Sequence, residues 1–196
     1  MADADAATPA DILTFWRAAG QDRWYTRDDA FDADIRSRYL HLWQRAAAGE
    51  LSAWEESDDG ALALTIVLDQ FPRNMFRGTA RAYEYDEQAL ALALTGMQAG
   101  ADGALDFAER WFFYMPLQHA ESREAQDESL AAFRRLLAEV PPELKSIFAG
   151  TLQFAEKHRA VIERFGRFPH RNALLGREST PEEERWLEEG GTTFGQ

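Results

Sequence analysis

Apolar residues recur at steps of three and four along most of the chain, which is the spacing of an amphipathic helix. Phe31, Ile35 and Tyr39, for example, fall on one face of a segment that begins near Asp28 and ends at Gly49. An aspartate caps the first turn of a helix, and a glycine accommodates the left-handed residue that often ends one. The pattern therefore predicts a helix over residues 28–49.

The same periodicity, punctuated by capping residues, glycines and prolines, predicts further helices. They are expected over residues 9–20, 61–68, 79–100, 103–116, 122–138, 142–165 and 180–190. Segment 61–68 is apolar on every side and could be read as a buried strand, but no second strand exists to pair with it. We therefore expect an all-α fold of about eight helices, in which antiparallel pairs stack into a tetratricopeptide-like bundle or superhelix. No clear repeat near the tetratricopeptide length is evident.

Length and composition are those of one domain. The chain has 196 residues, of which 45% are hydrophobic, and no low-complexity linker divides it. We predict a single helical domain over residues 1–196, with residues 1–8 disordered. The absence of cysteine excludes disulfides, thiolate catalysis and cysteine-bound zinc. Because we find neither a signal peptide nor an apolar run of about 18 residues, we expect a cytoplasmic location.

The formal net charge of −13 argues against two classes of partner. A strongly acidic chain is repelled by phosphate backbones and by anionic lipid, so neither nucleic acid nor a membrane is an expected partner. A small anion can still bind where basic side chains gather. Nearly all of the basic residues are arginines, which pair well with planar anions.

Two similar motifs each contain a Phe-Pro pair and an Arg-Asn pair. The first is Phe71-Pro72-Arg73-Asn74, and the second is Phe168-Pro169-His170-Arg171-Asn172. Because proline lacks a backbone donor and stops a preceding helix, both motifs are predicted to be helix-breaking loops. A guanidinium group held on a short, rigid loop can bind a carboxylate or a phosphate at a low ordering cost.

The polar residues of these motifs and their neighbours are therefore candidates for ligand binding. They are Asp69, Arg73, Asn74, Arg77, Arg167, Arg171, Asn172 and Arg177. A second interpretation stays open, in which the arginines pair with acids of the chain itself and only brace the helices. The acids considered for this role are Asp69, Asp86, Glu121 and Glu163.

A third helix break is expected at Pro116, which follows an aromatic helical stretch. His119 and Glu121 come just after it, and an extended backbone there would let the two side chains converge. A histidine is suited to act as a general acid or base, with a carboxylate to orient it. The candidate catalytic residues are His119, Glu121, His158 and His170. A lone histidine on such an apolar helical face, however, is usually a hydrogen-bonded packing residue, and this interpretation is kept for His158.

Several familiar chemical motifs are missing from the chain. No two histidines have the helical spacing of metal ligands, so no metal site is predicted. A dinucleotide-binding glycine motif, a Walker loop and a Gly-x-Ser-x-Gly elbow are also absent, and no cofactor is predicted.

Three motifs together resemble the bacterial domain-of-unknown-function family 924. They are Leu68–Asn74 with Phe76–Gly78, Tyr114–Glu121, and Phe165–Asn172 with Gly176–Thr180. The similarity runs from about Ile12 to Gln196. It implies an all-helical, tetratricopeptide-like superhelical fold and transfers no catalytic residue. Where the family more often has serine in a His-Ser-Glu triplet, this chain has Ala120.

Two hypotheses about function follow. In the first, the two Phe-Pro motifs and the His119 segment line one cleft that binds a small anionic or polar ligand. In the second, the protein is a non-enzymatic scaffold whose concave helical surface holds a protein partner, and the polar motifs only lock helix ends. A homodimer is a further hypothesis, because the helical faces are rich in aromatic residues.

Overall fold

The computed structural model describes residues 7–24 and 26–194. Within these ranges all regular structure is helical, which confirms the all-α prediction. Contacts divide the chain into two compact units, one within Met1–Leu105 and one within Asp106–Phe194. Of the residues expected to be disordered, 1–6 lie outside the described ranges, whereas Thr8 bonds Asp11 at the start of the first helix. The single domain and the superhelical arrangement stay predictions.

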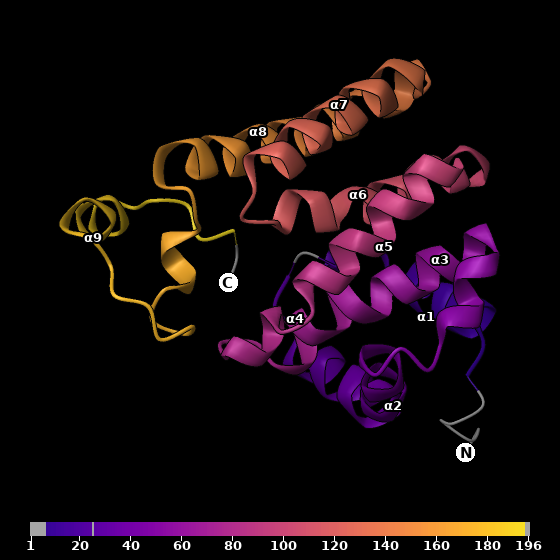
Figure 1. The fold of residues 1–196 in the computed structure, drawn as a ribbon. Coiled ribbons are helices and arrows are strands. Elements are labelled where there is room, and N and C mark those ends of the chain that lie inside the picture. Colours follow the sequence, from indigo (N-terminus) through magenta and orange to yellow (C-terminus); the bar gives the residue numbers. More distant parts are fainter. Residues whose placement is uncertain (1–6, 25, 195–196) are drawn as a thin grey trace. The chain divides into compact units, whose positions relative to one another are not determined.

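The first unit is an assembly of short and medium helices (Figure 1). Its elements are α1 (Pro9–Trp24), α2 (Asp29–Ala47), the 3₁₀ helix η2 (Ser52–Glu56), α3 (Asp58–Thr65), the π-helix η3 (Ile66–Gln70), α4 (Phe71–Met75), the 3₁₀ helices η4 (Ala80–Tyr83) and η5 (Ala101–Ala104), and α5 (Asp86–Ala99). Its core is aromatic around Phe71, which is fully buried. The Phe71 ring stacks on Tyr39 at 5.1 Å between centroids and packs against Trp16 at 5.9 Å.

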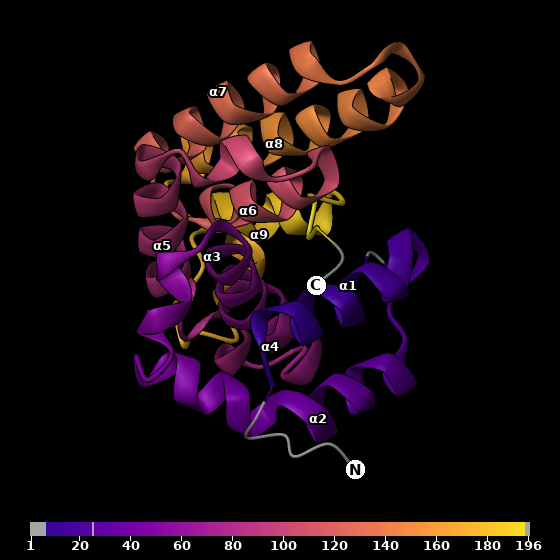
Figure 2. The ribbon, with the colours of Figure 1, turned by 90° about the vertical axis from the view of Figure 1, so that its right-hand side faces the viewer.

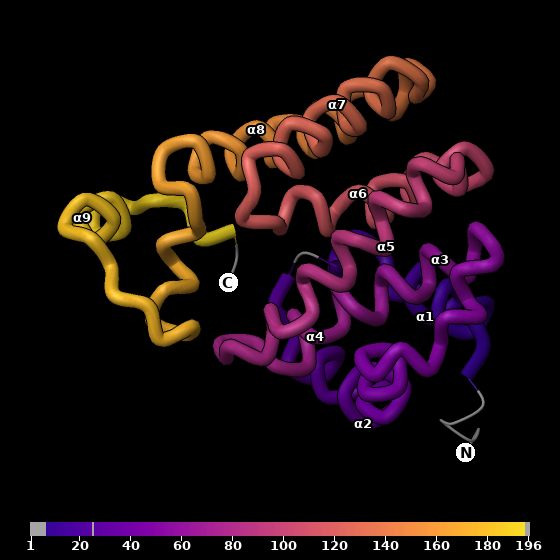
Figure 3. Tube along the Cα trace, viewed as in Figure 1, coloured from indigo at the N-terminus to yellow at the C-terminus, as the bar shows by residue number. Residues whose placement is uncertain are grey.

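The second unit contains a long antiparallel pair, α7 and α8, which lie side by side in both views (Figures 1 and 2). Its elements are α6 (Phe107–His119), α7 (Arg123–Glu139), the 3₁₀ helix η6 (Pro142–Leu144), α8 (Lys145–Phe165), the 3₁₀ helix η7 (Pro169–Arg171) and α9 (Pro181–Glu188). Between α8 and α9 the chain makes an irregular excursion that includes η7 (Figure 3). Among the described helices of the whole chain, none combines the length and the hydropathy of a membrane span.

Several helix ends lie where capping residues predict them. Asp28 accepts hydrogen bonds from two backbone N–H groups of α2, and the Ser122 side chain accepts one from the Ala125 N–H of α7. Thr180 and Glu183 form a reciprocal capping box at the start of α9. Gly166 ends α8 with φ 72, in the left-handed region that favours glycine. The segment 61–68 is helical in α3 and η3, as expected, and not a strand.

Three predicted boundaries were wrong. The first helix continues to Trp24 after an interruption at Gly20, whose φ of 69 is not helical. Residues 80–83 form only a 3₁₀ turn, and α5 begins at Asp86, after the non-helical Tyr85. Helix α6 continues through Pro116 to His119, because proline removes only its own donor from the helix. Beyond Pro116, the Gln126 side-chain amide donates to the Leu117, Gln118 and Ala120 carbonyls and satisfies the end of α6.

The first Phe-Pro motif is helical, so the prediction of a loop there was also wrong. The backbone widens into the π-helix η3, in which the Phe71 N–H donates to the Ile66 carbonyl. Pro72 then occupies the first turn of α4, where a missing donor is tolerated. The second motif does break the helix, because α8 ends at Gly166 and Phe168 is extended before the short turn η7.

Candidate functional site

In the first unit, the arginine of the first Phe-Pro motif is engaged with carboxylates. Arg73 donates from Nη1 and Nη2 to the two oxygens of Asp86, at 2.8 and 3.0 Å. Its Nη2 also lies 3.5 Å from an oxygen of Asp69, a fully buried residue of η3. One guanidinium group therefore joins α4 to the π-helix before it and to the first turn of α5.

Asn74 and Arg77 of the same motif converge on one acid of α2. The Asn74 side-chain amide donates to Asp32 Oδ1 at 2.7 Å. Arg77 binds both oxygens of Asp32, at 2.9 and 3.1 Å. This two-point geometry matches the guanidinium fork to a carboxylate, and it fixes the residues after α4 against α2.

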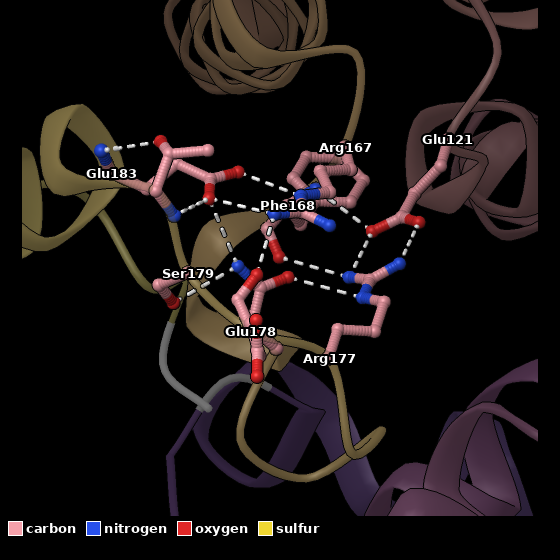
Figure 4. Close-up of polar contacts among 9 residues, drawn as sticks. Glu121, Arg167, Phe168, Arg177, Glu178, Ser179 and Glu183 are labelled. Carbon is pink, nitrogen blue, oxygen red and sulfur yellow. Dashed lines mark hydrogen bonds and ion pairs between the residues drawn. The ribbon is translucent and has the colours of Figure 1, made fainter.

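In the second unit, the second motif forms a network with the loop before α9 (Figure 4). Arg167 binds both oxygens of Glu183, at 2.7 and 2.8 Å, and hydrogen bonds from Arg167 lower the pKa of Glu183 to about 2. Asn172 donates to Ser179 and to Glu183, and its own oxygen accepts from Arg177. The side chains thereby tie the excursion between α8 and α9 to the N-terminus of α9.

Glu121 anchors the same excursion to the end of α6 (Figure 4). Arg177 binds its two oxygens at 2.6 and 2.9 Å, and the Phe168 N–H donates to Oε1 at 2.7 Å. Although burial raises the pKa of Glu121, the hydrogen bonds from Arg177 and Phe168 outweigh it and lower the pKa below its usual value. Glu121 is therefore a charged bracing group that holds Phe168 in place.

These contacts agree in part with the interpretation that the arginines pair with acids of the chain itself. Arg73 and Arg177 pair with Asp69, Asp86 and Glu121, the acids considered from sequence, whereas Glu163 pairs with Arg159 instead. The partners of Arg77 and Arg167, which are Asp32 and Glu183, were not foreseen. A ligand-binding role for these arginines stays a prediction.

All four candidate catalytic residues lie in the second unit, and its three histidines are linked by ring contacts in which Phe168 takes part. The rings of His119 and His158 are 6.1 Å apart between centroids. His158 meets the Phe168 ring edge-on at 5.6 Å, and His170 lies 5.7 Å from Phe168 on η7. Arg171 places its guanidinium carbon 4.4 Å from the centroid of Phe168 and donates to the His119 carbonyl at 3.0 Å. We call His119, His158 and His170 the histidine cluster.

A hydrogen bond in α8 indicates which ring nitrogen of His158 carries the proton. Its Nδ1 lies 2.8 Å from the carbonyl of Phe154, one turn earlier in α8. A carbonyl can only accept, so Nδ1 carries the proton and Nε2 keeps its lone pair. Burial, helped by the neighbouring His119, lowers the pKa of His158 to about 2.

His170 is the unusual member of the cluster. Both of its ring nitrogens are buried, and neither has a hydrogen-bond partner among the residues that the structure describes. Burial and the positive charge of Arg171 lower the pKa of His170 to about 4. The ring is therefore neutral near pH 7, with one donor and one acceptor that no described residue engages.

One residue of this region, Phe194, was not singled out from the sequence. Its ring stacks on His158, with 3.5 Å between centroids and 21° between planes. It also meets Phe168 at 5.8 Å and His170 at 5.9 Å, both in edge-on geometry. No pattern marks this position, because it follows Gly190 and Gly191 beyond the last periodic segment.

The structure places the candidates in two groups. Asp69, Arg73, Asn74 and Arg77 belong to the first unit, whereas His119, Glu121, His158 and the whole second Phe-Pro motif belong to the second. Across the described residues, no group of three or more histidine, aspartate or glutamate side chains is arranged to hold a metal ion. The two buried ring nitrogens of His170, which have no partner among the described residues, make the histidine cluster a candidate for binding through hydrogen bonds.

Comparisons with known proteins extend over almost the whole chain. A model of the family DUF924, described as a bacterial protein of unknown function, matches residues 12–191. A solved structure of a protein of unknown function from Agrobacterium tumefaciens, ATU0120, is similar, with 43% identity and a TM-score of 0.84. That similarity covers 93% of this chain and 97% of the other. No curated protein matches the chain. The family match includes both Phe-Pro motifs and all three histidines of the cluster.

Proposed function

The chain belongs to the bacterial family of unknown function DUF924, and we propose that it binds a small polar or anionic ligand at the histidine cluster of its second unit. The support comes above all from His170, whose two buried ring nitrogens have no partner among the described residues. Leaving a buried donor or acceptor unsatisfied costs about 1–3 kcal/mol. Buried polar atoms in native proteins are nearly always hydrogen-bonded, so an exception suggests a position that water or a ligand completes.

The surroundings of His170 favour a ligand with negative charge. Arg171 is the next residue, and after burial its positive charge is the second cause of the low pKa of His170. Arg177 acts on His170 in the same direction, whereas Glu121 opposes it. A positive local field in an otherwise acidic protein attracts small anions and leaves large polyanions repelled by the molecule as a whole.

The protonation states of His158 and His170 favour ligand binding over proton transfer by these residues. A general acid or base works best with a pKa near the working pH. His158, with a pKa of about 2, and His170, with a pKa of about 4, remain neutral at pH 7. Neutral rings donate and accept hydrogen bonds without titrating, which suits a binding site. We therefore assign His158 and His170 to ligand recognition.

A comparison of two histidine variants tests this proposal. His170→Phe removes both nitrogens of the cluster residue and keeps a planar ring, whereas His41→Phe makes the same change at an exposed histidine of α2 in the first unit. Each protein is titrated by calorimetry with phosphate, succinate, nicotinate and adenine. We expect at least one probe to bind wild type and His41→Phe and to bind His170→Phe at least tenfold more weakly, a loss of about 1.4 kcal/mol.

Equal binding of every probe to wild type and to His170→Phe would contradict the proposal. The scaffold hypothesis makes a different prediction, a stoichiometric complex with one protein partner that no small anion affects. Affinity purification from a bacterial lysate, followed by reconstitution with the purified partner, measures this. Such a complex, unchanged in His170→Phe, would favour the scaffold over the ligand site.

A further inference from the structure

The segment that follows α9 places the Phe194 ring against the histidine cluster. Among the described residues, no hydrogen bond holds Thr192, Thr193 or Phe194 to the rest of the chain. The last backbone bond before them joins the Gly191 N–H to the Trp186 carbonyl. Phe194 is held by its ring, which contacts His158, Phe168 and His170 and packs against the apolar cluster of Val161, Ile162 and Phe168. Release of this segment therefore breaks no hydrogen bond of the described chain.

Phe194 also has an unfavourable backbone. Its φ of 55 makes it the one non-glycine residue with positive φ among those described. A side chain with a Cβ pays roughly 1–2 kcal/mol for the left-handed region. Strain of this kind persists where surrounding contacts impose it, and it clusters at ligand clamps and switch regions. Withdrawal of the ring from the cluster would let the backbone relax.

The Phe194 ring cannot satisfy the residues that it covers. A phenyl group has no hydrogen-bonding atom, although it lies edge-on to His170, whose two nitrogens lack partners among the described residues. A flat ring with nitrogen or oxygen at its edge would keep the stacking on His158 and would also bond His170. Such a ring matches the position better than the phenyl group that occupies it.

This inference rests on the proposed ligand site. We propose that the Phe194 ring occupies the position of a planar heteroaromatic ring of the ligand and is displaced when the ligand binds. We call the Phe194 ring the plug. The ligand class is thereby narrowed to a small, flat, nitrogen-containing aromatic compound that carries negative charge. Nicotinate has these properties and serves as the probe, and succinate is the probe without a ring. The plug and the ligand ring compete for one position, so only molecules with the plug open can bind the ligand. The apparent affinity of wild type is therefore the intrinsic affinity multiplied by the open fraction.

Calorimetric titration of three full-length proteins tests the plug. In Phe194→Ala the cluster is uncovered, whereas Phe154→Ala removes an exposed phenyl group of α8 that is 52% accessible and serves as the control. We expect Phe194→Ala to bind nicotinate about tenfold more tightly than wild type, which corresponds to a plug that is closed in about nine molecules of ten. Phe154→Ala should bind nicotinate as wild type does, and the Phe194→Ala change should leave succinate binding unaltered.

The results that would contradict the plug differ from those that would contradict the proposed ligand site. Equal or weaker nicotinate binding by Phe194→Ala, with binding still lost in His170→Phe, would overturn the plug and leave the ligand site standing. An equal gain for succinate and nicotinate would overturn the heteroaromatic class. If no probe distinguished wild type from His170→Phe, the site itself would be rejected.

Discussion

Arg73 shows how a polar motif can serve the fold. Its side chain is only 10% exposed and lies between Asp86 and Asp69, of which the second is 1% exposed. Removal of one partner from a buried ion pair is costly because it leaves an uncompensated charge out of water. An exposed pair of the same chemistry contributes little, since water and salt screen it.

Arg73→Gln is therefore expected to lower the free energy of unfolding by about 3 kcal/mol. Urea denaturation followed by circular dichroism measures this change. Arg27→Gln, which breaks the exposed pair with Asp29 in the same unit, is the control and should leave the free energy unchanged. A loss in Arg73→Gln no larger than in Arg27→Gln would mean that the buried acids find another partner.

His158 links stability to pH. Its pKa is about 2 in the folded protein and near 6.5 in the unfolded chain, so between these values only the unfolded state takes up the proton. The neutral His158 ring therefore stabilises the folded protein at pH 7, and this stabilisation falls as the pH drops below 6.5. The loss is up to about 1.4 kcal/mol per pH unit for this one side chain.

We expect His158→Gln, which cannot titrate, to show a shallower fall in stability between about pH 6 and about pH 4.5. The measurement is a series of urea denaturations across this range. Wild type should lose about 1.4 kcal/mol per unit more than the variant. Parallel slopes would show that His158 is protonated in the folded state, contrary to the effect expected from its burial.

At the scale of elements, the sequence predicts helices well because periodicity and caps are local. The helix of residues 28–49 and the capping box at Thr180 depend on neighbours within one or two turns. Proline is harder to interpret. Pro72 lies inside a helical run that absorbs it through a π-turn, whereas Pro169 comes after Gly166 has already ended α8. The difference lies in the preceding turn and not in the Phe-Pro pair itself.

The candidate site was predictable in its residue types and not in its pairings. The sequence places His119 and His170 near predicted helix breaks and His158 on an apolar helix face, and the structure links the three through ring contacts in which Phe168 takes part. Which acid each arginine meets depends on tertiary contacts between residues up to 56 positions apart. Phe194 has no functional group that marks it in the sequence, so only its ring contacts in the structure identify it.

One glycine inside α8 and one directly after it provide a test in which the two substitutions should have opposite effects on stability. Gly150 lies inside the helix with nothing within 4 Å of an added Cβ, so Gly150→Ala should stabilise the protein by about 0.5–1 kcal/mol. Gly166 also has open space around it, but its φ of 72 makes alanine strained. Gly166→Ala should destabilise by about 1 kcal/mol. Thermal denaturation of the two variants measures both effects, and a shared sign would contradict the assigned end of α8.

At the scale of the whole molecule, the length of the chain predicts one domain, while its contacts form two compact units. The two Phe-Pro motifs lie in different units, whereas all residues of the ligand site proposed for the histidine cluster belong to the second unit. Cooperative unfolding is the property that distinguishes one domain from two.

If residues 1–196 form one domain, a destabilising change in either unit lowers the protection of both. Arg73→Gln acts in the first unit, and hydrogen exchange in increasing urea reports the opening of each helix separately. We expect this variant to shift the exchange of amides in α2 and in α8 to lower urea by the same amount, because one global unfolding event exposes them all. Gly166→Ala, placed in the second unit, should move both helices together as well. A shift confined to the unit that carries the substitution would show that the two units unfold independently, and the prediction of one domain would then be wrong.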